Sequence, residues 1–291
     1  MNNVALFAVT VLIWGTSWIA IAWQIGPVPI SVSVFYRILL AAILLSSALA
    51  LWGRLSLPTR WRFIIIQGLC LFSLNFVALY NATALIPSGL VSVIFSLASI
   101  FNAMNARIFF GDRITFRVVI AGAIGVTGLV LLFWESLAVS LNLQTLRGVA
   151  WAGLGTLMFS WGNMASRSNS AFGISPILAN TWSMGIGACI LLILITVSGQ
   201  PMVVPPDPTY VVALIYLAVF ASIIGFTTYL LLVERIGSAQ AAYATVLFPV
   251  VALLVSTLFE NYQWTLTATI GVGLALSGNV VMFAARRSCS Y

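Results

Sequence analysis

Long apolar segments follow one another along almost the whole chain. Their lengths match the roughly 20 residues that a helix needs to cross the hydrocarbon core of a bilayer. Short clusters of Gly, Pro and Arg separate them, and none has the alternating pattern of an outer-membrane β-strand. The sequence therefore predicts ten transmembrane helices, over residues 4–23, 29–52, 61–81, 88–109, 116–133, 149–166, 176–197, 210–233, 239–259 and 266–285.

The composition excludes a soluble globular protein. Of the 291 residues, 62% are hydrophobic and 6% are charged, whereas soluble domains carry roughly 25% charged residues. The net charge of +7 comes from twelve arginines against five acidic residues. Basic residues beside membrane spans are expected from topology, so the charge predicts a lipid bilayer and no nucleic acid as partner. There is no His, and the three cysteines have no metal-ligand or disulfide spacing, so we expect no metal and no cofactor.

The arginines also predict the orientation. With the N-terminus in the cytoplasm, ten of the eleven loop and tail arginines lie on the cytoplasmic side, and only Arg147 lies outside. The first span lacks the basic segment that opens a cleavable signal peptide, so we expect it to be retained as a helix. Both termini are therefore expected in the cytoplasm.

The two halves of the chain resemble each other. A shift of 150 residues aligns residues 75–133 with residues 225–283 without a gap, and nearer the start of each half a shift of 147 pairs Trp14 with Trp161. Because each half holds five spans, the second half enters the membrane from the opposite side, a plan that recurs in secondary transporters. The sequence predicts two inverted five-helix repeats around a central cavity, at residues 1–140 and 141–291.

Four motifs carry a resemblance to a known family. They are WGTSW at 14–18, FYRILLAA at 35–42, FFGDRIT at 109–115 and ERIGSAQAA at 234–242, the last followed by Pro249 and Glu260. In this order and duplication they resemble the EamA-type family of the drug/metabolite transporter superfamily, most closely the YddG-type amino acid exporters. The family's Pro and Gly-Glu positions around the fourth helix hold Ser99 and Asp112 here. These positions therefore do not indicate a substrate.

The resemblance implies both a fold and a function. The family's spans 1, 3, 4, 6, 8 and 9 enclose a central cavity that opens to either side by alternating access. Its members lie in the bacterial inner membrane and export small neutral or zwitterionic metabolites. For this chain the implied substrates are amino acids, aromatic and other neutral ones, with no cofactor and no obligate protein partner.

Polar and aromatic side chains within spans indicate where a substrate binds, because polar groups avoid hydrocarbon and face the bundle interior. Trp161 is the strongest candidate, since the repeat pairs it with Trp14. Helix packing explains Trp and Ser at such positions equally well, and Tyr229 could instead face lipid at an interface. The predicted substrate-binding residues are Trp14, Ser17, Asn75, Tyr80, Ser96, Trp161, Asn163, Thr228, Tyr229 and Tyr243.

Arg37 and Pro249 are expected to have structural or gating roles. Arg37 is the only basic residue that the topology places inside a span. It could extend to the outer headgroups, link helices through backbone carbonyls, or attract a substrate carboxylate. No span centre carries a carboxylate, which favours facilitated exchange or gradient-driven export over a proton relay.

Three other functions fit the sequence less well. A carrier of phosphate-bearing metabolites, such as nucleotide sugars or triose phosphates, would have only one intramembrane Arg and no Lys to hold the phosphate. A membrane-embedded enzyme would lack His, metal clusters and paired acids, so no catalytic residue is predicted. Composition allows a receptor or a channel, but an inverted repeat favours alternating access.

A reporter fused to the C-terminus tests the predicted orientation. We expect activity from a reporter that works only in the cytoplasm, because the arginine-rich loops then remain inside. Activity from a reporter that works only in the periplasm would contradict the count of ten spans.

Overall fold

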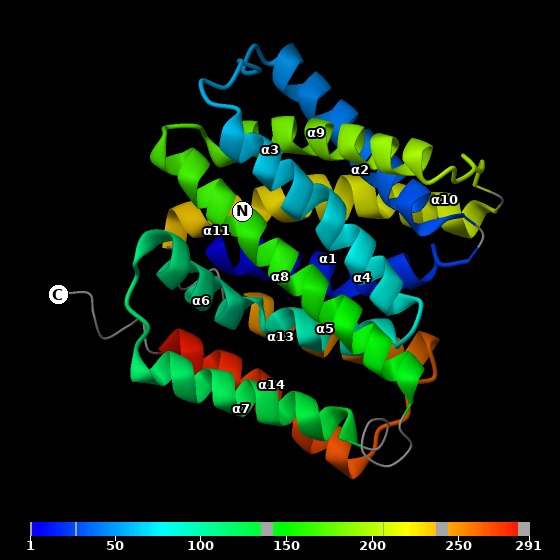
Figure 1. The fold of residues 1–291 in the computed structure, drawn as a ribbon, viewed down its shortest axis with the longest axis vertical. Coiled ribbons are helices and arrows are strands. Elements are labelled where there is room, and N and C mark those ends of the chain that lie inside the picture. The colour runs from blue at the N-terminus through cyan, green and yellow to red at the C-terminus, as the bar shows by residue number, and fades with distance from the viewer. Residues whose placement is uncertain (1, 27, 135–141, 206, 237–243, 285–291) are drawn as a thin grey trace.

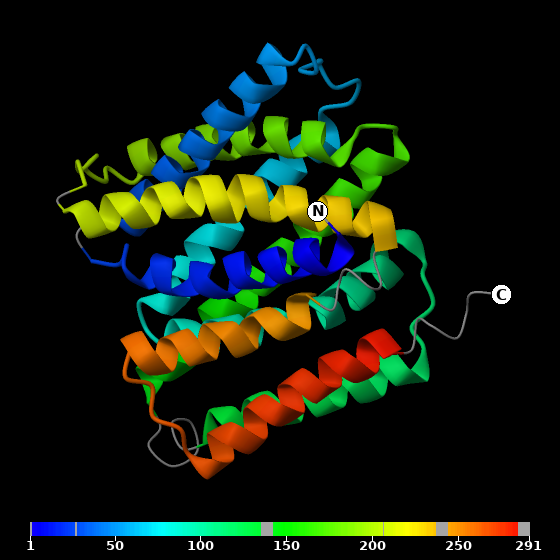
Figure 2. The ribbon, with the colours of Figure 1, turned by 180° about the vertical axis from the view of Figure 1, so that it is seen from behind.

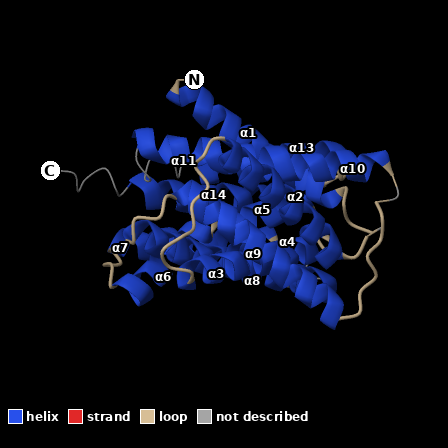
Figure 3. Ribbon diagram, turned by 90° about the horizontal axis from the view of Figure 1, so that it is seen from above, coloured by secondary structure: helices blue, strands red, loops and turns tan. Residues whose placement is uncertain are grey.

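Every regular element of the structure, a computed structural model, is a helix (Figure 3). The structure describes residues 2–26, 28–134, 142–205, 207–236 and 244–284. The helices are α1 (Asn3–Ala22), α2 (Ile30–Leu51), α3 (Arg62–Leu69), η1 (Cys70–Leu74), α4 (Asn75–Thr83), α5 (Ser88–Ser96), α6 (Ala98–Phe110), α7 (Phe116–Leu132), α8 (Leu143–Ala171), α9 (Pro176–Val197), α10 (Pro208–Ile215), η3 (Tyr216–Ile224), α11 (Gly225–Ile236), α13 (Ala244–Phe259) and α14 (Leu266–Ala284).

These helices form ten spans, which confirms the predicted all-α membrane protein. The third span is α3, η1 and α4, the fourth is α5 and α6, and the eighth is α10, η3 and α11. The sixth span, α8, is longer than the predicted 149–166. It begins earlier because the Asn142 side chain caps its first turn, accepting hydrogen bonds from the backbone N–H groups of Gln144 and Thr145.

Length and composition support the membrane assignment. Within the described residues, six helical segments are long and apolar enough to cross a bilayer, and three shorter apolar segments accompany them. The remaining span is α8, which has 29 residues but carries Arg147, Arg167 and many polar side chains. One face of this span is buried against the bundle, where Thr156, Ser160 and Asn169 are fully buried, while Trp151, Leu154 and Trp161 are exposed on it.

The packing of the helices has a two-fold pattern. Figures 1 and 2 show α7 and α14 side by side at one edge of the molecule, and α2 packs on α9 near the other edge. Each of these pairs joins corresponding spans of the two halves. Between them, α1 packs on α11 and α13, while α8 packs on α4, α5 and α6. If each span is replaced by its counterpart in the other half, every one of these pairings becomes a pairing of the same set. This is expected for two related five-helix repeats.

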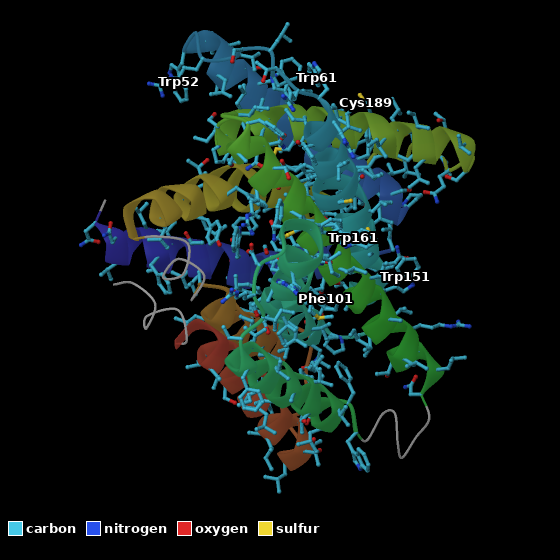
Figure 4. The ribbon with its side chains drawn as sticks, turned by 60° about the vertical axis from the view of Figure 1, so that its left-hand side comes forward. Trp52, Trp61, Phe101, Trp151, Trp161 and Cys189 are labelled. Atoms are coloured by element: carbon cyan, nitrogen blue, oxygen red, sulfur yellow. The ribbon has the colours of Figure 1, made fainter. Side chains whose placement is uncertain are left out.

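One end of the bundle collects features of a membrane interface. The start of α1 and the end of α14 lie at the same end, as an even number of spans requires (Figure 2). Trp52 and Trp61 stand beside the loop from α2 to α3 at this end (Figure 4), and both side chains are exposed. Exposed Trp next to the basic Arg54 and Arg60 is typical of the boundary between lipid and water.

The third and eighth spans both contain a π-helical segment. In η1 the Ser73 hydroxyl donates to the Gly68 carbonyl oxygen at 3.2 Å, and in η3 the Ser222 hydroxyl donates to the Leu217 carbonyl oxygen at 2.9 Å. The backbone itself bonds five residues back at the end of each segment, from the Asn75 N–H to the Cys70 carbonyl oxygen and from the Gly225 N–H to the Phe220 carbonyl oxygen, which is the spacing of a π-helix. Such segments change the direction of side chains and often lie at functional sites. Because η1 and η3 lie in corresponding spans of the two halves, they indicate a functional site between the halves, at the centre of the bundle.

Close contact between α7 and α14 depends on glycine. A Cβ atom on Gly271 would lie 2.5 Å from the Leu132 backbone nitrogen and 2.6 Å from the Gly128 carbonyl oxygen. A Cβ on Gly128 would likewise lie 2.5 Å from the Ala275 nitrogen. Small residues allow two backbones to approach in this way, which is a main source of helix association in membranes.

Gly271→Ala is therefore expected to destabilise the protein by about 2 kcal/mol, since overpacked cores lose stability of this order. The matched control is Gly273→Ala in the same helix, because a Cβ on Gly273 meets no atom within 4 Å. Thermal unfolding in detergent measures both variants. Equal melting temperatures would contradict the close α7–α14 contact.

Candidate functional site

A cavity lies at the centre of the bundle. The cavity has a volume of about 70 Å³, which is room for several waters. The lining comes from every span expected from the family resemblance and also from α2. The lining residues are Trp14, Ser17, Trp18, Ile21, Arg37, Asn75, Phe76, Leu79, Phe95, Phe159, Ala221, Phe226, Thr245 and Phe248.

Trp14 joins the two halves at this cavity. Its indole nitrogen donates to the Ala221 carbonyl oxygen of η3 at 3.3 Å. Its ring centroid lies 5.5 Å from that of Phe226 and 5.1 Å from that of Tyr229. A Cβ on Gly225 would lie 2.5 Å from the indole nitrogen, so glycine at this position leaves the space that the ring occupies.

Arg37 lines the cavity, so of the three alternatives left open for it, the reach to the outer headgroups is excluded. The residue is only 3% exposed. Its Nε donates to the Ser222 hydroxyl at 3.2 Å, and its guanidinium lies over the Phe76 ring, 4.1 Å from the centroid. Burial of a guanidinium is costly, and a side-chain hydroxyl with an aromatic face offsets part of that cost.

Asn75 and Ser17 are the predicted polar residues that line the cavity. The Asn75 amide nitrogen donates to the Leu71 carbonyl oxygen of η1 at 3.2 Å, while its Oδ1 has no partner among the described residues. The Ser17 hydroxyl donates to the Trp14 carbonyl oxygen at 2.8 Å within its own helix. Asn75 therefore presents a buried acceptor, whereas the Ser17 hydrogen is already used by its own helix.

Three other predicted residues are buried beside the cavity without lining it. The Tyr80 hydroxyl donates to Gln24 Oε1 at 2.7 Å, and the Ser96 hydroxyl donates to the Val93 carbonyl oxygen at 2.7 Å. The Thr228 hydroxyl accepts a bond from Thr10 at 3.0 Å. The Tyr80 and Thr228 contacts hold the first span and its C-terminal end against the third and eighth spans, whereas the Ser96 bond lies within α5.

Tyr229 and Pro249 lie inside the bundle as well. Tyr229 is half-buried and packs its ring on Trp14, and it lies outside the cavity lining. Pro249 is buried within α13. Tyr243 lies outside the described residues.

Trp161 does not share the cavity with Trp14, contrary to the placement that the repeat predicts. It lies on α8 (Figure 4), is 37% exposed, and its indole nitrogen donates to Asn105 Oδ1 at 3.3 Å. Asn163 donates to Asn102 Oδ1 at 3.4 Å and is also outside the lining. The cause is the rotation of α8, which directs Phe159 into the cavity and Trp161 towards α6.

Sequence analysis missed most of the aromatic wall. Phe95, Phe159, Phe226 and Phe248 line the cavity from four different spans. The chain has 18 Phe residues, and an apolar ring fits a lipid-facing position as well as an interior one. Ser222, the anchor of Arg37, carried a weak signal, since it is a hydroxyl inside the apolar segment 215–224.

The acidic residues with described side chains are bonded away from the cavity. The Glu260 carboxylate accepts bonds from the Ser88 backbone N–H at 3.1 Å and caps α5. Asp207 caps α10 through the Tyr210 N–H. Asp112 pairs with Arg167 at 2.7 Å between exposed side chains. Among the residues that the structure describes, no cluster of three His, Cys, Asp or Glu side chains could hold a metal ion.

Such a cavity can bind a small solute. Its aromatic rings offer stacking and apolar area, and Arg37 and Asn75 add one charged donor and one acceptor.

Two relatives and one solved structure show what this chain is similar to. The Escherichia coli (strain K12) protein described as "Uncharacterized inner membrane transporter YedA" is 26% identical over 87% of this chain and 81% of its own length. The "Probable amino-acid metabolite efflux pump" of the same organism is 24% identical over 94% of this chain and 92% of its own. A solved crystal structure covers 99% of both chains with a TM-score of 0.70 at 17% identity, which shows a shared fold alone.

The model of the EamA-like transporter family matches the chain twice, at residues 2–134 and 146–284. These two matches take in nearly all of the ten spans. The protein is therefore a multi-pass membrane transporter, and it belongs to the EamA-like transporter family.

Proposed function

We propose that this transporter exports small neutral or zwitterionic metabolites, most specifically amino acids with aromatic or other neutral side chains. The central cavity carries this proposal. Seven of its fourteen lining residues are aromatic, and its polar groups include one guanidinium and one amide. Aromatic walls suit apolar side chains, and a single cation suits a singly charged carboxylate better than a phosphate, which needs several donors.

One relative supports the substrate class. The Escherichia coli protein described as a probable amino-acid metabolite efflux pump aligns over most of both chains. The Escherichia coli protein described as an inner membrane transporter supports a bacterial inner membrane location. The placement of the arginines supports cytoplasmic termini. We also propose that the two repeats divide at residues 140 and 141. That boundary lies outside the described residues.

Alternating access is supported by a difference between the two halves. The glycines Gly15 and Gly162 occupy equivalent repeat positions. A Cβ on Gly15 would meet Val251 of α13 at 2.6 Å, whereas a Cβ on Gly162 would meet Leu71 of η1 at 2.6 Å. Equivalent residues thus contact non-equivalent spans. In an inverted repeat, exchanging the two environments converts one access state into the other.

Counterflow in proteoliposomes tests the transport activity. Vesicles loaded with an unlabelled neutral amino acid are expected to accumulate the labelled one against its gradient, since a carrier exchanges substrates across alternating states. A panel of the twenty amino acids with a sugar phosphate as comparator identifies the substrate class. Accumulation of the sugar phosphate alone, or equilibration without overshoot, would contradict an amino acid carrier.

Trp161 is proposed to contact substrate in the opposite access state, where α8 takes the environment that α1 has here. Trp161→Ala is then expected to lower the transport efficiency for phenylalanine about fivefold relative to alanine, the effect of about 1 kcal/mol of ring contact. Trp151→Ala is the matched control, because this residue is also 37% exposed and also on α8.

Thermal unfolding of both Trp variants checks that each protein is folded, since loss of a packed ring alone lowers stability. If a folded Trp161→Ala protein transports phenylalanine and alanine at their original ratio, Trp161 is a packing residue only.

A further inference from the structure

Two buried polar atoms at the cavity have no hydrogen-bond partner among the described residues. They are Arg37 Nη1 and Asn75 Oδ1. Both residues line the cavity, and they are 3% and 2% exposed. One atom can only donate a hydrogen bond, and the other can only accept one.

The neighbouring contacts hold both side chains in place and leave these atoms unused. Arg37 is held through Nε by Ser222 in η3 and through its guanidinium face by Phe76. Asn75 is held through its amide nitrogen by the Leu71 carbonyl oxygen in η1. The two π-helical segments therefore supply one anchor each, η3 for Arg37 and η1 for Asn75.

Burial of such groups requires partners. An unpaired polar group out of water costs free energy, and an unpaired charge costs more. Among the acidic residues whose side chains the structure describes, Asp112, Asp207 and Glu260 are bonded elsewhere and do not pair with Arg37. A ligand that brings both an anion and a hydrogen-bond donor would satisfy the two atoms at once.

We propose that Arg37 and Asn75 form a dipolar subsite for the main-chain groups of an α-amino acid. Arg37 Nη1 donates to the carboxylate, and Asn75 Oδ1 accepts from the ammonium group. The side chain of the substrate then lies against Trp14, Phe95 and Phe248. The inference rests on the proposed amino acid transport and adds how the substrate is selected, by its two charges rather than by its side chain.

The wild-type protein gives the first test. Three compounds of similar shape compete for counterflow of labelled phenylalanine, namely L-phenylalanine, L-phenylalaninamide, which lacks the carboxylate, and 3-phenylpropanoate, which lacks the ammonium. Each lost charge-assisted contact is expected to weaken competition about tenfold. The same order is expected for the increase in melting temperature on adding each compound, which is measured without transport.

Variants assign each charge to its residue. Arg37→Met is expected to remove the advantage of phenylalanine over its amide and to keep the advantage over phenylpropanoate. Asn75→Leu is expected to do the reverse. The matched control is Gln67→Leu, a fully buried amide that is bonded to Asn169 and Asn180 away from the cavity. It is expected to lower stability without changing either ratio.

The outcomes separate the two proposals. If phenylalanine is carried and its amide and phenylpropanoate compete equally well, the dipolar subsite is wrong while amino acid transport stands. If only one analogue competes as well as phenylalanine, one of the two contacts is absent and the subsite is also wrong. If no amino acid is carried or raises the melting temperature, the proposed function and the subsite fail together. Where Arg37→Met does not fold, Arg37→Lys and the wild-type panel decide.

Discussion

Hydrocarbon offers no hydrogen bond to the backbone, and this constraint shapes the whole molecule. Each span must satisfy its own N–H and C=O groups, which leaves helices as the form available to these apolar segments. Departures from regular helix are tolerated only where protein surrounds them. The π-helical segments η1 and η3 and the break at Leu97 between α5 and α6 all have buried residues, and Leu97 is 5% exposed.

The same constraint concentrates the chemistry at the centre. Carbonyl oxygens of irregular segments are free to accept side-chain donors, as Ala221 accepts from Trp14 and Leu71 accepts from Asn75. Arg37 avoids lipid by reaching the hydroxyl of Ser222 in η3. Irregular backbone, aromatic rings and the buried cation thus occur together, which is the arrangement that midplane binding sites of transporters use.

The pairing of spans is two-fold, but the detailed contacts are not. Trp14 bonds to η3 while its counterpart Trp161 bonds to Asn105 of α6. In a fully symmetric bundle the two sides of the membrane would be equivalent, and the cavity would not open to one side in preference to the other. This asymmetry is seen in how α1 and α8 contact their neighbours, and under the proposed alternating access these two helices would exchange environments. The glycine contact of α7 with α14 is the opposite case, a close and rigid seam.

Several features follow from the amino-acid sequence without coordinates, namely the helical class, the ten spans, the repeat and the family. Each depends on apolar segment length, on arginine placement or on motif order, and these are local or statistical properties. The cavity lining followed only in part. Trp14, Ser17 and Asn75 were identified because polar and aromatic groups mark interior faces. The Phe wall, the Ser222 anchor and the displaced Trp161 were decided by tertiary structure. Spans that are apolar on every side carry no amphipathic signal, so packing alone sets the rotation of each helix and which of its rings reaches the cavity.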